Sequence, residues 1–235
     1  MRLGQLDALL VGKAVPFARR GTRSAIAKQA VEGALAATAL GLAGDEQGDL
    51  RIHGGVDKAI HLYPREHYAR WQQLIGEHPL LAAPGAFGEN LATVGMTEPT
   101  ICLGDVIRCG TTLLEVSQTR QPCWKLNDRF GVPDMALRMQ GTGMTGWYFR
   151  VLEGGHMRAG DRFALEARPY PDWSLARVVA VLYQRTLDRD ELLGLAALPL
   201  VPSWQRLVQR RVEQAQVEDW SGRLCGPAQM TVEGG

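Results

Sequence analysis

The sequence predicts a mainly β domain followed by a small helical subdomain. In the first two thirds of the 235-residue chain, short apolar segments alternate with Gly and Asp turn signals, as in a barrel or sandwich. After Pro171 the apolar residues recur at helical spacing instead. A chain of this length can form one substantial core with a small appendage. We therefore expect a β domain over residues 1–168, a three-helix subdomain over 172–215 and a loose tail over 222–235.

The predicted strands are short, and each is bounded by turn residues. Two of them follow the same local design, in which a Gly-Asp turn at Gly104 or Gly160 starts a strand. The aromatic run at residues 147–149 is expected to form a buried strand. The remaining predicted strands cover residues 6–11, 26–31, 36–42, 59–63, 91–94, 106–109 and 113–116.

Two peripheral helices are expected to cover the ends of the β domain. Pro64 suits the first position of a helix, where a missing N–H costs little. His67 and Trp71 then share one face, and Pro79 should end this helix. The second helix is predicted over residues 133–139.

The three C-terminal helices each begin with a candidate N-cap. Ser174, Asp188 and Ser203 carry side-chain oxygens that can accept a backbone N–H from the first helical turn. Glu191, three residues after Asp188, adds a pattern similar to a capping box. Three short helices cannot enclose a large core of their own, so we expect them to dock on the β domain.

The overall charge excludes some classes of partner. The chain has 26 Lys and Arg against 25 Asp and Glu, a formal net charge of +1, which provides no general field for nucleic acid or a membrane surface. Asp7 interrupts the N-terminal apolar run, which argues against a secretory signal. The small-residue stretch from Gly33 to Gly44 is shorter than the ~20 apolar residues of a membrane span. We expect a soluble, cytoplasmic protein.

Cys123 is the most informative candidate residue. Pro122 before it cannot donate to a strand ladder, so the strand should end there and present Cys123 at its rim. Arg120 and Lys125 are close in sequence, and nearby cations favour a thiolate over a thiol. A thiolate is a suitable ligand for a soft metal. The alternative is a buried structural thiol, which we expect for Cys102, Cys109 and Cys225, because they show no metal-binding spacing.

His53 and His61 flank a glycine-rich segment. No nearby carboxylate or cysteine completes a metal site with them. Gly54 and Gly55 instead permit close approach of the backbone to a ligand, with His53 or Lys58 as a donor. We expect His61 to pack in the core, with proton relay as the alternative.

Four motifs follow one another along the chain. They are Gly-Asp-Glu-Gln at 44–47, His-Gly-Gly-Val-Asp-Lys-Ala at 53–59, Phe-Gly-Glu-Asn-Leu at 87–91, and Ser-Gln-Thr-Arg-Gln-Pro-Cys-Trp-Lys-Leu at 117–126. In this order they resemble the MOSC domain family, named for the C-terminal part of molybdenum cofactor sulfurases, and the chain looks most like the YiiM branch, which carries a small three-helix tail. This resemblance implies a MOSC-type β-barrel with peripheral helices and reaches to about residue 170, or about 215 with the tail. We expect Asp45, in the first motif, to be structural.

The resemblance also implies a cofactor site for the molybdenum cofactor (molybdopterin). Cys123 would be the protein ligand of the molybdenum atom. Thr119 and Arg120 fall where amidoxime-reducing relatives bind the phosphate of the cofactor, and Lys28 matches a lysine directed at the same phosphate. Convergent donors of this kind suit a phosphate. The alternative for Lys28 and Arg120 is a solvated surface charge.

Asn90 falls where an asparagine of those relatives contacts the pterin, whose edge needs a group that both donates and accepts. In one respect the sequence departs from them. The relatives carry an arginine in the segment before this asparagine, whereas this chain has Gly88 and Glu89. The other pterin contacts therefore cannot be transferred.

The function implied by the resemblance is reduction of N-hydroxylated compounds, such as the nucleobase 6-hydroxylaminopurine, in detoxification. The sequence shows no flavin, haem or iron-sulfur signature, so electrons would come from a separate protein such as a flavoprotein reductase. The family also suggests a homodimer. Aromatic residues could stack on a planar purine or pack in the core, which is the more common use: Trp124, Phe130 and residues 147–149.

Two other functions remain open. A sulfur carrier would hold a persulfide on Cys123, which requires an exposed and mobile cysteine, whereas a metal ligand is recessed and oriented. The neighbouring Trp124 favours the recessed arrangement. A non-catalytic cofactor-binding protein would keep the same phosphate and pterin donors without turnover.

Overall fold

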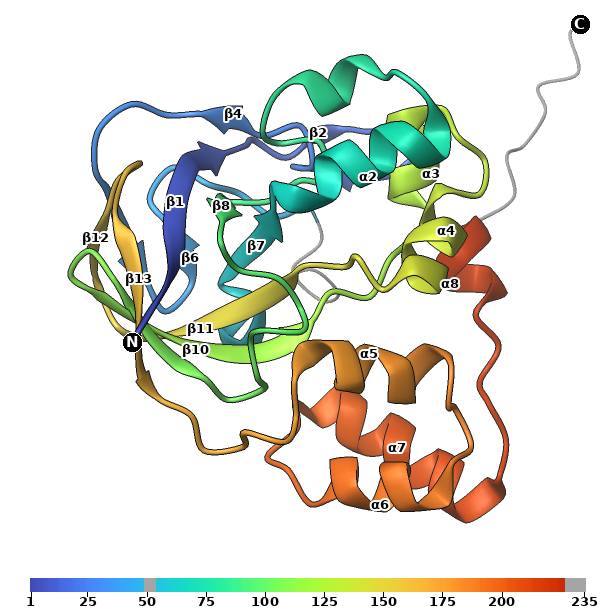
Figure 1. Ribbon diagram of the computed structural model, residues 1–235. Coiled ribbons are helices and arrows are strands. Elements are labelled where there is room, and N and C mark those ends of the chain that lie inside the picture. The colour runs from blue at the N-terminus through green and yellow to red at the C-terminus, as the bar shows by residue number, and fades with distance from the viewer. Residues whose placement is uncertain (49–53, 227–235) are drawn as a thin grey trace, which may run out of the picture.

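A closed β-barrel forms the centre of the molecule. The computed structural model describes residues 1–48 and 54–226 (Figure 1). In this part of the chain, seven strands follow the order β13-β9-β10-β11-β7-β8-β1, and β1 pairs again with β13 to close the barrel. The predicted mainly β fold is confirmed. The strands are β1 (Arg2–Val11), β7 (Ile60–Pro64), β8 (Leu91–Val94), β9 (Val106–Cys109), β10 (Thr112–Thr119), β11 (Trp147–Glu153) and β13 (Arg162–Ala167).

The neighbours β7 and β8 run parallel, whereas the other barrel neighbours are antiparallel. Parallel neighbours need a crossover connection, which here contains α2 (Glu66–Ile75) and the 3-10 helix η2 (Pro79–Ala82). The crossover returns to the barrel through residues 85–90. This connection therefore places the Phe-Gly-Glu-Asn motif at one end of the barrel.

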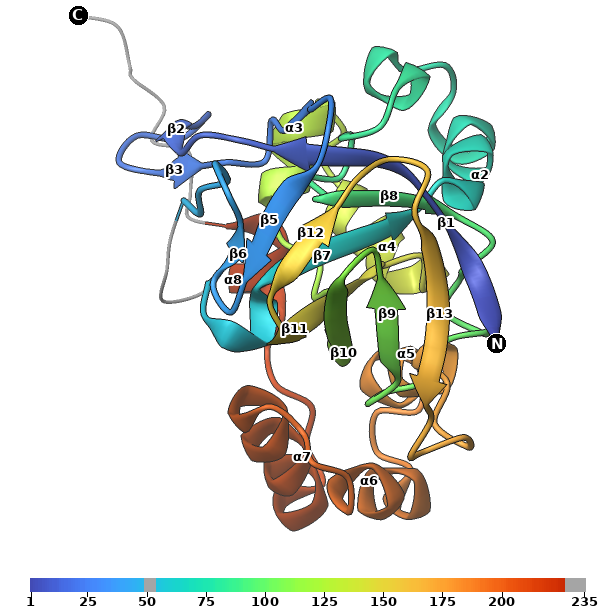
Figure 2. The ribbon, with the colours of Figure 1, turned by 90° about the vertical axis from the view of Figure 1, so that its left-hand side faces the viewer.

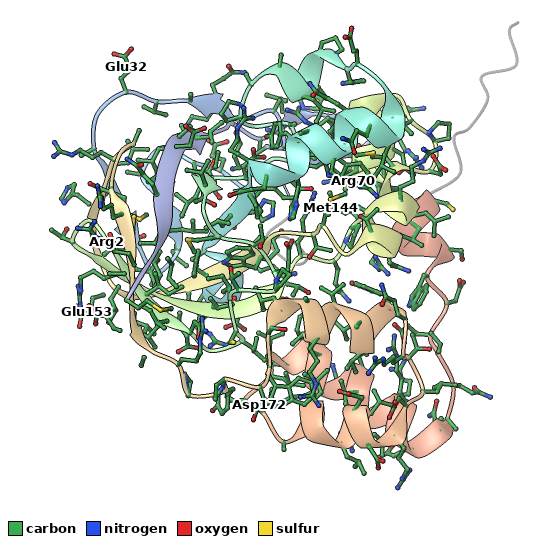
Figure 3. The ribbon with its side chains drawn as sticks, viewed as in Figure 1. Arg2, Glu32, Arg70, Met144, Glu153 and Asp172 are labelled. Carbon is green, nitrogen blue, oxygen red and sulfur yellow. The ribbon has the colours of Figure 1, made fainter. Side chains whose placement is uncertain are left out.

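Helices cover that end. The helix α2 lies there with α3 (Lys125–Phe130) and α4 (Met135–Thr142), as Figure 1 shows. Their apolar faces enclose a cluster around Phe87, whose ring stacks on Tyr63 with 4.1 Å between centroids. In Figure 3, the labelled side chains Arg70 and Met144 lie at this end, while Arg2 and Glu153 lie on the opposite side of the barrel.

The C-terminal helices pack beside the barrel and share its core. They are α5 (Leu175–Tyr183), α6 (Arg189–Ala196) and α7 (Pro202–Gln214), joined to the barrel near Asp172 (Figure 3). Trp204 of α7 belongs to the same buried cluster as Leu103 and Ile107 of the barrel side. The expected docking of these helices is therefore confirmed.

Two of the predicted N-caps are confirmed and one is wrong. The Ser174 hydroxyl accepts a hydrogen bond from the Arg177 N–H at 3.2 Å, and the Asp188 carboxylate accepts one from the Glu191 N–H at 3.2 Å. The helix α7 instead begins at Pro202, so Ser203 lies inside its first turn. Proline is favoured at the first helical position because its fixed φ is already helical.

Two predicted strands are interrupted. The segment 26–31 contains only β4 (Gln29–Ala30), preceded by β3 (Arg23–Ser24), which pairs with β2 (Val15–Pro16). The segment 36–42 is a hairpin of β5 (Leu35–Thr38) and β6 (Gly41–Leu42), and β12 (Gly155–Met157) adds to its edge (Figure 2). Apolar composition alone did not show these turns.

Helix positions near the barrel end also differ from the predictions. Pro64 is the last residue of β7, and α2 begins at Glu66 and ends at Ile75, with Gly76 as its C-cap, rather than running to Pro79. Gly76 has a φ of 82°, which favours glycine after a helix. The predicted helix over 133–139 lies at 135–142, and the sequence analysis missed α3. Residues 222–225, assigned to a loose tail, belong to α8 (Ser221–Cys225).

Within the two described ranges, no helix combines the length and the apolar character needed to cross a membrane.

Candidate functional site

A pocket opens at the helix-covered end of the barrel, where segments distant in sequence meet. Its walls come from the β3–β4 connection, the segment after β6, the start of β7, the loop before β8, the loop after β10 and the start of α3. The residues lining it are Ser24, Ala25, Ile26, Lys28, Asp45, Glu46, Gln47, Gly48, Lys58, His61, Phe87, Gly88, Asn90, Arg120, Cys123, Lys125 and Tyr148.

Cys123 reaches this pocket from the loop between β10 and α3. The strand β10 ends at Thr119, and the Arg120 N–H still donates to the Gly146 carbonyl at 3.0 Å. Pro122 is buried and Cys123 is half-buried on the pocket wall. The strand therefore ends three residues before Pro122 rather than at it, and Cys123 lies in the loop beyond the strand, where it is recessed rather than freely exposed.

Lys28 and Asn90 are both held by Asp45. The Lys28 ammonium pairs with the Asp45 carboxylate, and both side chains are 7% exposed. The same carboxylate accepts hydrogen bonds from the Asn90 Nδ2 and the Gly12 N–H, each at 2.8 Å. The Asn90 Oδ1 accepts from the His61 N–H at 3.1 Å. This network fixes two candidate cofactor-binding residues in one orientation.

Burial lowers the pKa of Lys28, and the charge and hydrogen bond of Asp45 oppose this shift. The ammonium form of Lys28 thus depends on a nearby anion. Asp45 supplies that anion in this structure, and a bound phosphate would supply another. The sequence analysis expected Asp45 to be only a structural turn residue. The structure shows that it is also part of the pocket wall.

Three further cations line the pocket. Arg120 is 7% exposed, and its Nη1 lies 3.6 Å from the Met139 Sδ. The Lys125 ammonium donates to the Arg23 carbonyl at 2.7 Å. The Lys58 ammonium lies 6.0 Å from the centre of the Tyr148 ring. Together with Lys28, they form a concentration of positive charge in a protein whose net charge is near zero.

Lys58 is placed by its neighbour Asp57. The Asp57 carbonyl accepts the Ser117 hydroxyl at 2.6 Å, and its carboxylate pairs with the Arg150 Nε at 2.6 Å. These contacts tie the 3-10 helix η1 (Val56–Lys58) to β10 and β11. Burial lowers the pKa of Lys58, while the nearby Cys123 and Asp57 oppose the shift.

His61 lies on the pocket wall and is uncharged near neutral pH. Burial lowers its pKa well below the ordinary value of 6.5, and the positive charge of Arg120 adds to this shift. Its Nε2 is buried and has no hydrogen-bond partner among the described residues. The ring lies 5.0 Å from the Tyr148 ring, centroid to centroid. A neutral imidazole of this kind can donate or accept a hydrogen bond.

The loop before Asn90 is braced from within. The Glu89 carboxylate is fully buried and accepts from the Gly85 N–H at 2.7 Å, the Phe87 N–H at 3.0 Å and the Tyr68 hydroxyl at 2.5 Å. Gly88 has a φ of 74°, and a Cβ there would lie 2.6 Å from the Ile26 Cγ1. Glu89 therefore shapes the pocket wall, since its oxygens are engaged in holding this loop.

The structure brings most of the predicted site residues together. Five of them line the pocket: Lys28, Lys58, Asn90, Arg120 and Cys123. Thr119 is fully buried and is not among the residues that line the pocket, and its hydroxyl has no hydrogen-bond partner in the described ranges. His53 lies outside the described residues.

Among the lining residues that sequence reasoning did not assign to the site, four carry side chains that matter most for its chemistry: Asp45, His61, Lys125 and Tyr148. Asp45 and His61 each lie inside or beside a motif that was recognised, so the motifs themselves were the available signal. Lys125 was considered only as a neighbouring charge, and Tyr148 was expected to be core because it lies in an aromatic strand. In β11, however, Trp147 and Phe149 face the core while Tyr148 is half-buried. Alternation along a strand explains this difference.

No three His, Cys, Asp or Glu side chains gather into a metal-binding group within residues 1–48 and 54–226. A metal bound through Cys123 would therefore need most of its ligands from a cofactor.

Comparisons with known proteins agree with this architecture. Family models match residues 49–164 as a MOSC domain and residues 173–215 as a YiiM-like 3-alpha helix domain. Protein YiiM of Escherichia coli is 42% identical over 207 residues, which cover 88% of this chain and 92% of that protein. The chain belongs to the YiiM-like branch of the MOSC family.

Two further MOSC comparisons are informative. The crystal structure of YiiM from Escherichia coli superposes with a TM-score of 0.80 at 36% identity, covering 96% of this chain and 100% of that one. A protein of Gibberella moniliformis named "Reductase" is 38% identical over 193 residues, which cover 82% of this chain and 34% of that longer protein.

Proposed function

We propose that this protein is a molybdenum cofactor-dependent reductase of N-hydroxylated compounds, with Cys123 as the protein ligand of the metal. The observation that carries the proposal is the convergence of a recessed thiol with four buried or half-buried cations in one pocket. Membership of the MOSC family supports the cofactor, and the name of the Gibberella moniliformis relative supports the reductase class.

The residues of the pocket fit such a cofactor. A phosphate is held by convergent cationic donors, and Lys28 and Arg120 provide them here. A pterin edge needs groups that donate and accept, and the unpartnered Nε2 of His61 is a buried polar atom available for this purpose. Cys123 supplies the soft ligand. When bound, the cofactor would supply the two-electron reduction that converts an N-hydroxyl group and two protons into an amine and water.

The residues of the chain would bind the cofactor, orient its ligands and donate protons to the substrate. Arg120 and Lys28 would hold the phosphate, while Asp45 keeps Lys28 and Asn90 oriented toward the pocket. Lys58 suits proton donation, because its lowered pKa makes the ammonium a stronger acid beside Cys123. Glu89 is less suited to this role, because loop amides and the Tyr68 hydroxyl occupy its carboxylate.

For the substrate, we propose an N-hydroxylated nucleobase such as 6-hydroxylaminopurine, which implies a role in detoxification. The aromatic and imidazole rings of Phe87, Tyr148 and His61 line the pocket, and flat rings of this type favour a planar base. Electrons would come from a separate donor protein, such as a flavoprotein reductase, and the active form would be a homodimer in the cytoplasm.

The proposal is tested by metal and pterin analysis. The wild type, Cys123→Ser and Cys225→Ser are purified from a host that makes molybdenum cofactor. We expect near-stoichiometric molybdenum and pterin in the wild type, loss of molybdenum in Cys123→Ser, and no change in Cys225→Ser. Cys225 is the matched control because it is exposed and does not line the pocket. Reduction of 6-hydroxylaminopurine with an artificial electron donor should follow the molybdenum content.

Two outcomes would contradict the proposal. Full molybdenum content in Cys123→Ser would exclude Cys123 as the ligand. Absence of molybdenum and pterin from wild-type protein made in the same host would favour a sulfur carrier instead, and mass spectrometry would then be used to look for a persulfide on Cys123. A protein that binds the cofactor but reduces no N-hydroxylated compound would be a non-catalytic binding protein.

A further inference from the structure

The chain after α7 returns from the helical subdomain to the loop that carries Cys123. Figure 1 shows α8 beside α3 and α4, at the end of a connection that runs from α7. We call residues 216–226 the C-terminal strap. Its first half is fixed to the helical subdomain, because the Glu218 carboxylate accepts from the Arg211 Nη2 at 2.7 Å and from the Arg211 Nε at 2.9 Å.

The second half of the strap is fixed to the β2–β3 loop, to α3 and to the Cys123 loop. The Arg19 Nη1 donates to the Cys225 carbonyl at 2.8 Å, and the Asn127 Nδ2 donates to the Leu224 carbonyl at 2.8 Å. Packing is close as well, since a Cβ on Gly226 would lie 2.5 Å from the Trp124 Cγ. Strap and loop are therefore complementary in shape and in hydrogen bonding.

Arg223 makes the decisive contacts. Its Nη1 donates to the Pro122 carbonyl at 2.5 Å, and its own backbone carbonyl accepts from the Trp124 N–H at 2.9 Å. A single residue thus holds the peptide groups on both sides of Cys123. When both flanking peptides are fixed, the direction of the Cα–Cβ bond of Cys123 is fixed too.

The guanidinium of Arg223 is itself oriented by two other elements. Its Nη2 donates to the Gln140 Oε1 of α4 at 2.6 Å, and its Cζ lies 5.7 Å from the centre of the Tyr183 ring of α5. Gln140 is only 3% exposed. The planar fork of an arginine can bridge two acceptors in this way, whereas a lysine offers a single charged nitrogen.

We infer that Arg223 is a positioning residue for Cys123, and that the C-terminal strap is a structural part of the site. This inference rests on the proposed role of Cys123 as the metal ligand. A metal ligand acts best when surrounding contacts hold it in one orientation. The strap also links the three-helix subdomain to the loop that carries Cys123. The subdomain therefore helps to orient Cys123, although none of its residues lines the pocket.

The test measures alkylation of each cysteine by iodoacetamide in full-length, cofactor-free protein, with mass spectrometry to resolve the four thiols. Arg223→Ala should speed alkylation of Cys123 roughly tenfold, because the flanking peptides lose the contact that opposes local opening. Arg223→Lys keeps the charge but lacks the planar fork that spans the Pro122 and Gln140 acceptors, so its rate should lie between those of the wild type and Arg223→Ala. Arg210→Ala is the matched control, since Arg210 is an exposed arginine of α7.

Cys102 and Cys109 report on general loosening, because both are buried in the barrel region. Their alkylation rates should stay unchanged in every variant. The inference is overturned if Cys123 reacts in folded Arg223→Ala as it does in the wild type, or if Cys102 and Cys109 accelerate together with it. If Arg223→Ala does not fold, the alkylation rates of Cys123, Cys102 and Cys109 in Arg223→Lys are compared with the wild type in the same way.

This experiment is independent of the proposed function. It uses protein without cofactor, so alkylation reports the position of the thiol whether or not molybdenum binds. If Cys123 is not the metal ligand, the molybdenum content of Cys123→Ser will show it. If Arg223 does not position Cys123, the alkylation rate of Cys123 in Arg223→Ala will show it.

Discussion

At the scale of single residues, Asp45 organises the pocket. Its carboxylate holds the Lys28 ammonium, the Asn90 amide and the Gly12 N–H at once. A buried ion pair is costly to desolvate, and it is stable only when additional hydrogen bonds satisfy both charges. Here the carboxylate has those bonds, whereas the ammonium faces a pocket. Under the proposed function, this arrangement would let Lys28 bind the phosphate of the cofactor while Asp45 stabilises it in the free protein.

The first prediction concerns this carboxylate. Asp45→Asn should lower the free energy of unfolding by about 3 kcal/mol, because it leaves the buried Lys28 without its counter-ion. Urea denaturation monitored by tryptophan fluorescence would measure the change. Glu46→Gln is the control, since the neighbouring Glu46 pairs with Lys13 at an exposed position and should cost much less. Equal effects of the two substitutions would show that the Asp45 network does not stabilise the fold.

At the scale of elements, local signals were sufficient for some helix starts and insufficient for others. The caps at Ser174 and Asp188 depend on neighbours three residues away, and the sequence was sufficient to predict them. Pro64 was misassigned because proline suits both a helix start and the end of a strand, and β7 is fixed by pairing with β8 and β11. Pairing with distant segments decided between two conformations that the residue itself allows.

The strap yields a prediction about pH. Burial raises the pKa of Glu218, but hydrogen bonds from Arg211 and Trp220 outweigh it, so the net pKa is lower than the ordinary 4.5. A lowered pKa in the folded state stabilises the protein above the unfolded-state pKa, and this contribution is lost as pH falls through the folded-state value.

Glu218→Gln should therefore be less stable than the wild type at pH 7, and the difference should shrink below about pH 4.5. Urea denaturation at several pH values would measure it. Asp190→Asn, at an exposed position in the first turn of α6, serves as a control. A stability difference that stays constant down to pH 3 would argue against a charge-dependent anchor.

At the scale of the whole molecule, the barrel and the C-terminal helices share one apolar core. Buried residues of both belong to a single cluster, including Ile101 and Leu103 on the barrel side and Leu175 and Trp204 on the helical side. Backbone hydrogen bonds join them as well, from the Leu175 N–H to the Ile101 carbonyl at 2.8 Å. Two units joined by a continuous core are expected to unfold cooperatively.

This shared core leads to the last prediction. Trp204→Ala should lower the free energy of unfolding by about 3 to 5 kcal/mol, because it removes a fully buried ring, and unfolding should remain a single transition. Far-UV circular dichroism and tryptophan fluorescence during denaturation would test both points. Leu193→Ala, at a site 45% exposed, should change stability by only about 0.5 kcal/mol. Two separate transitions in the wild type would show that the helices fold independently.

The sequence by itself determined the mainly β domain and the helical appendage. Both depend on local composition, because turn residues and caps act on their immediate neighbours. The family resemblance added the closed barrel and identified five residues of the pocket.

Only the tertiary structure decided how those residues act together. Asp45 meets Asn90 across 45 positions of sequence, and Arg223 meets Pro122 across 101. Such contacts form when the closed barrel and its docked helices bring chain segments together, and no local pattern encodes them. The charge state of a side chain and its hydrogen-bond partners depend on which groups lie near it in the folded molecule. For that reason the orientation of Cys123, the pairing of Lys28 and the neutral state of His61 became visible only in the folded molecule.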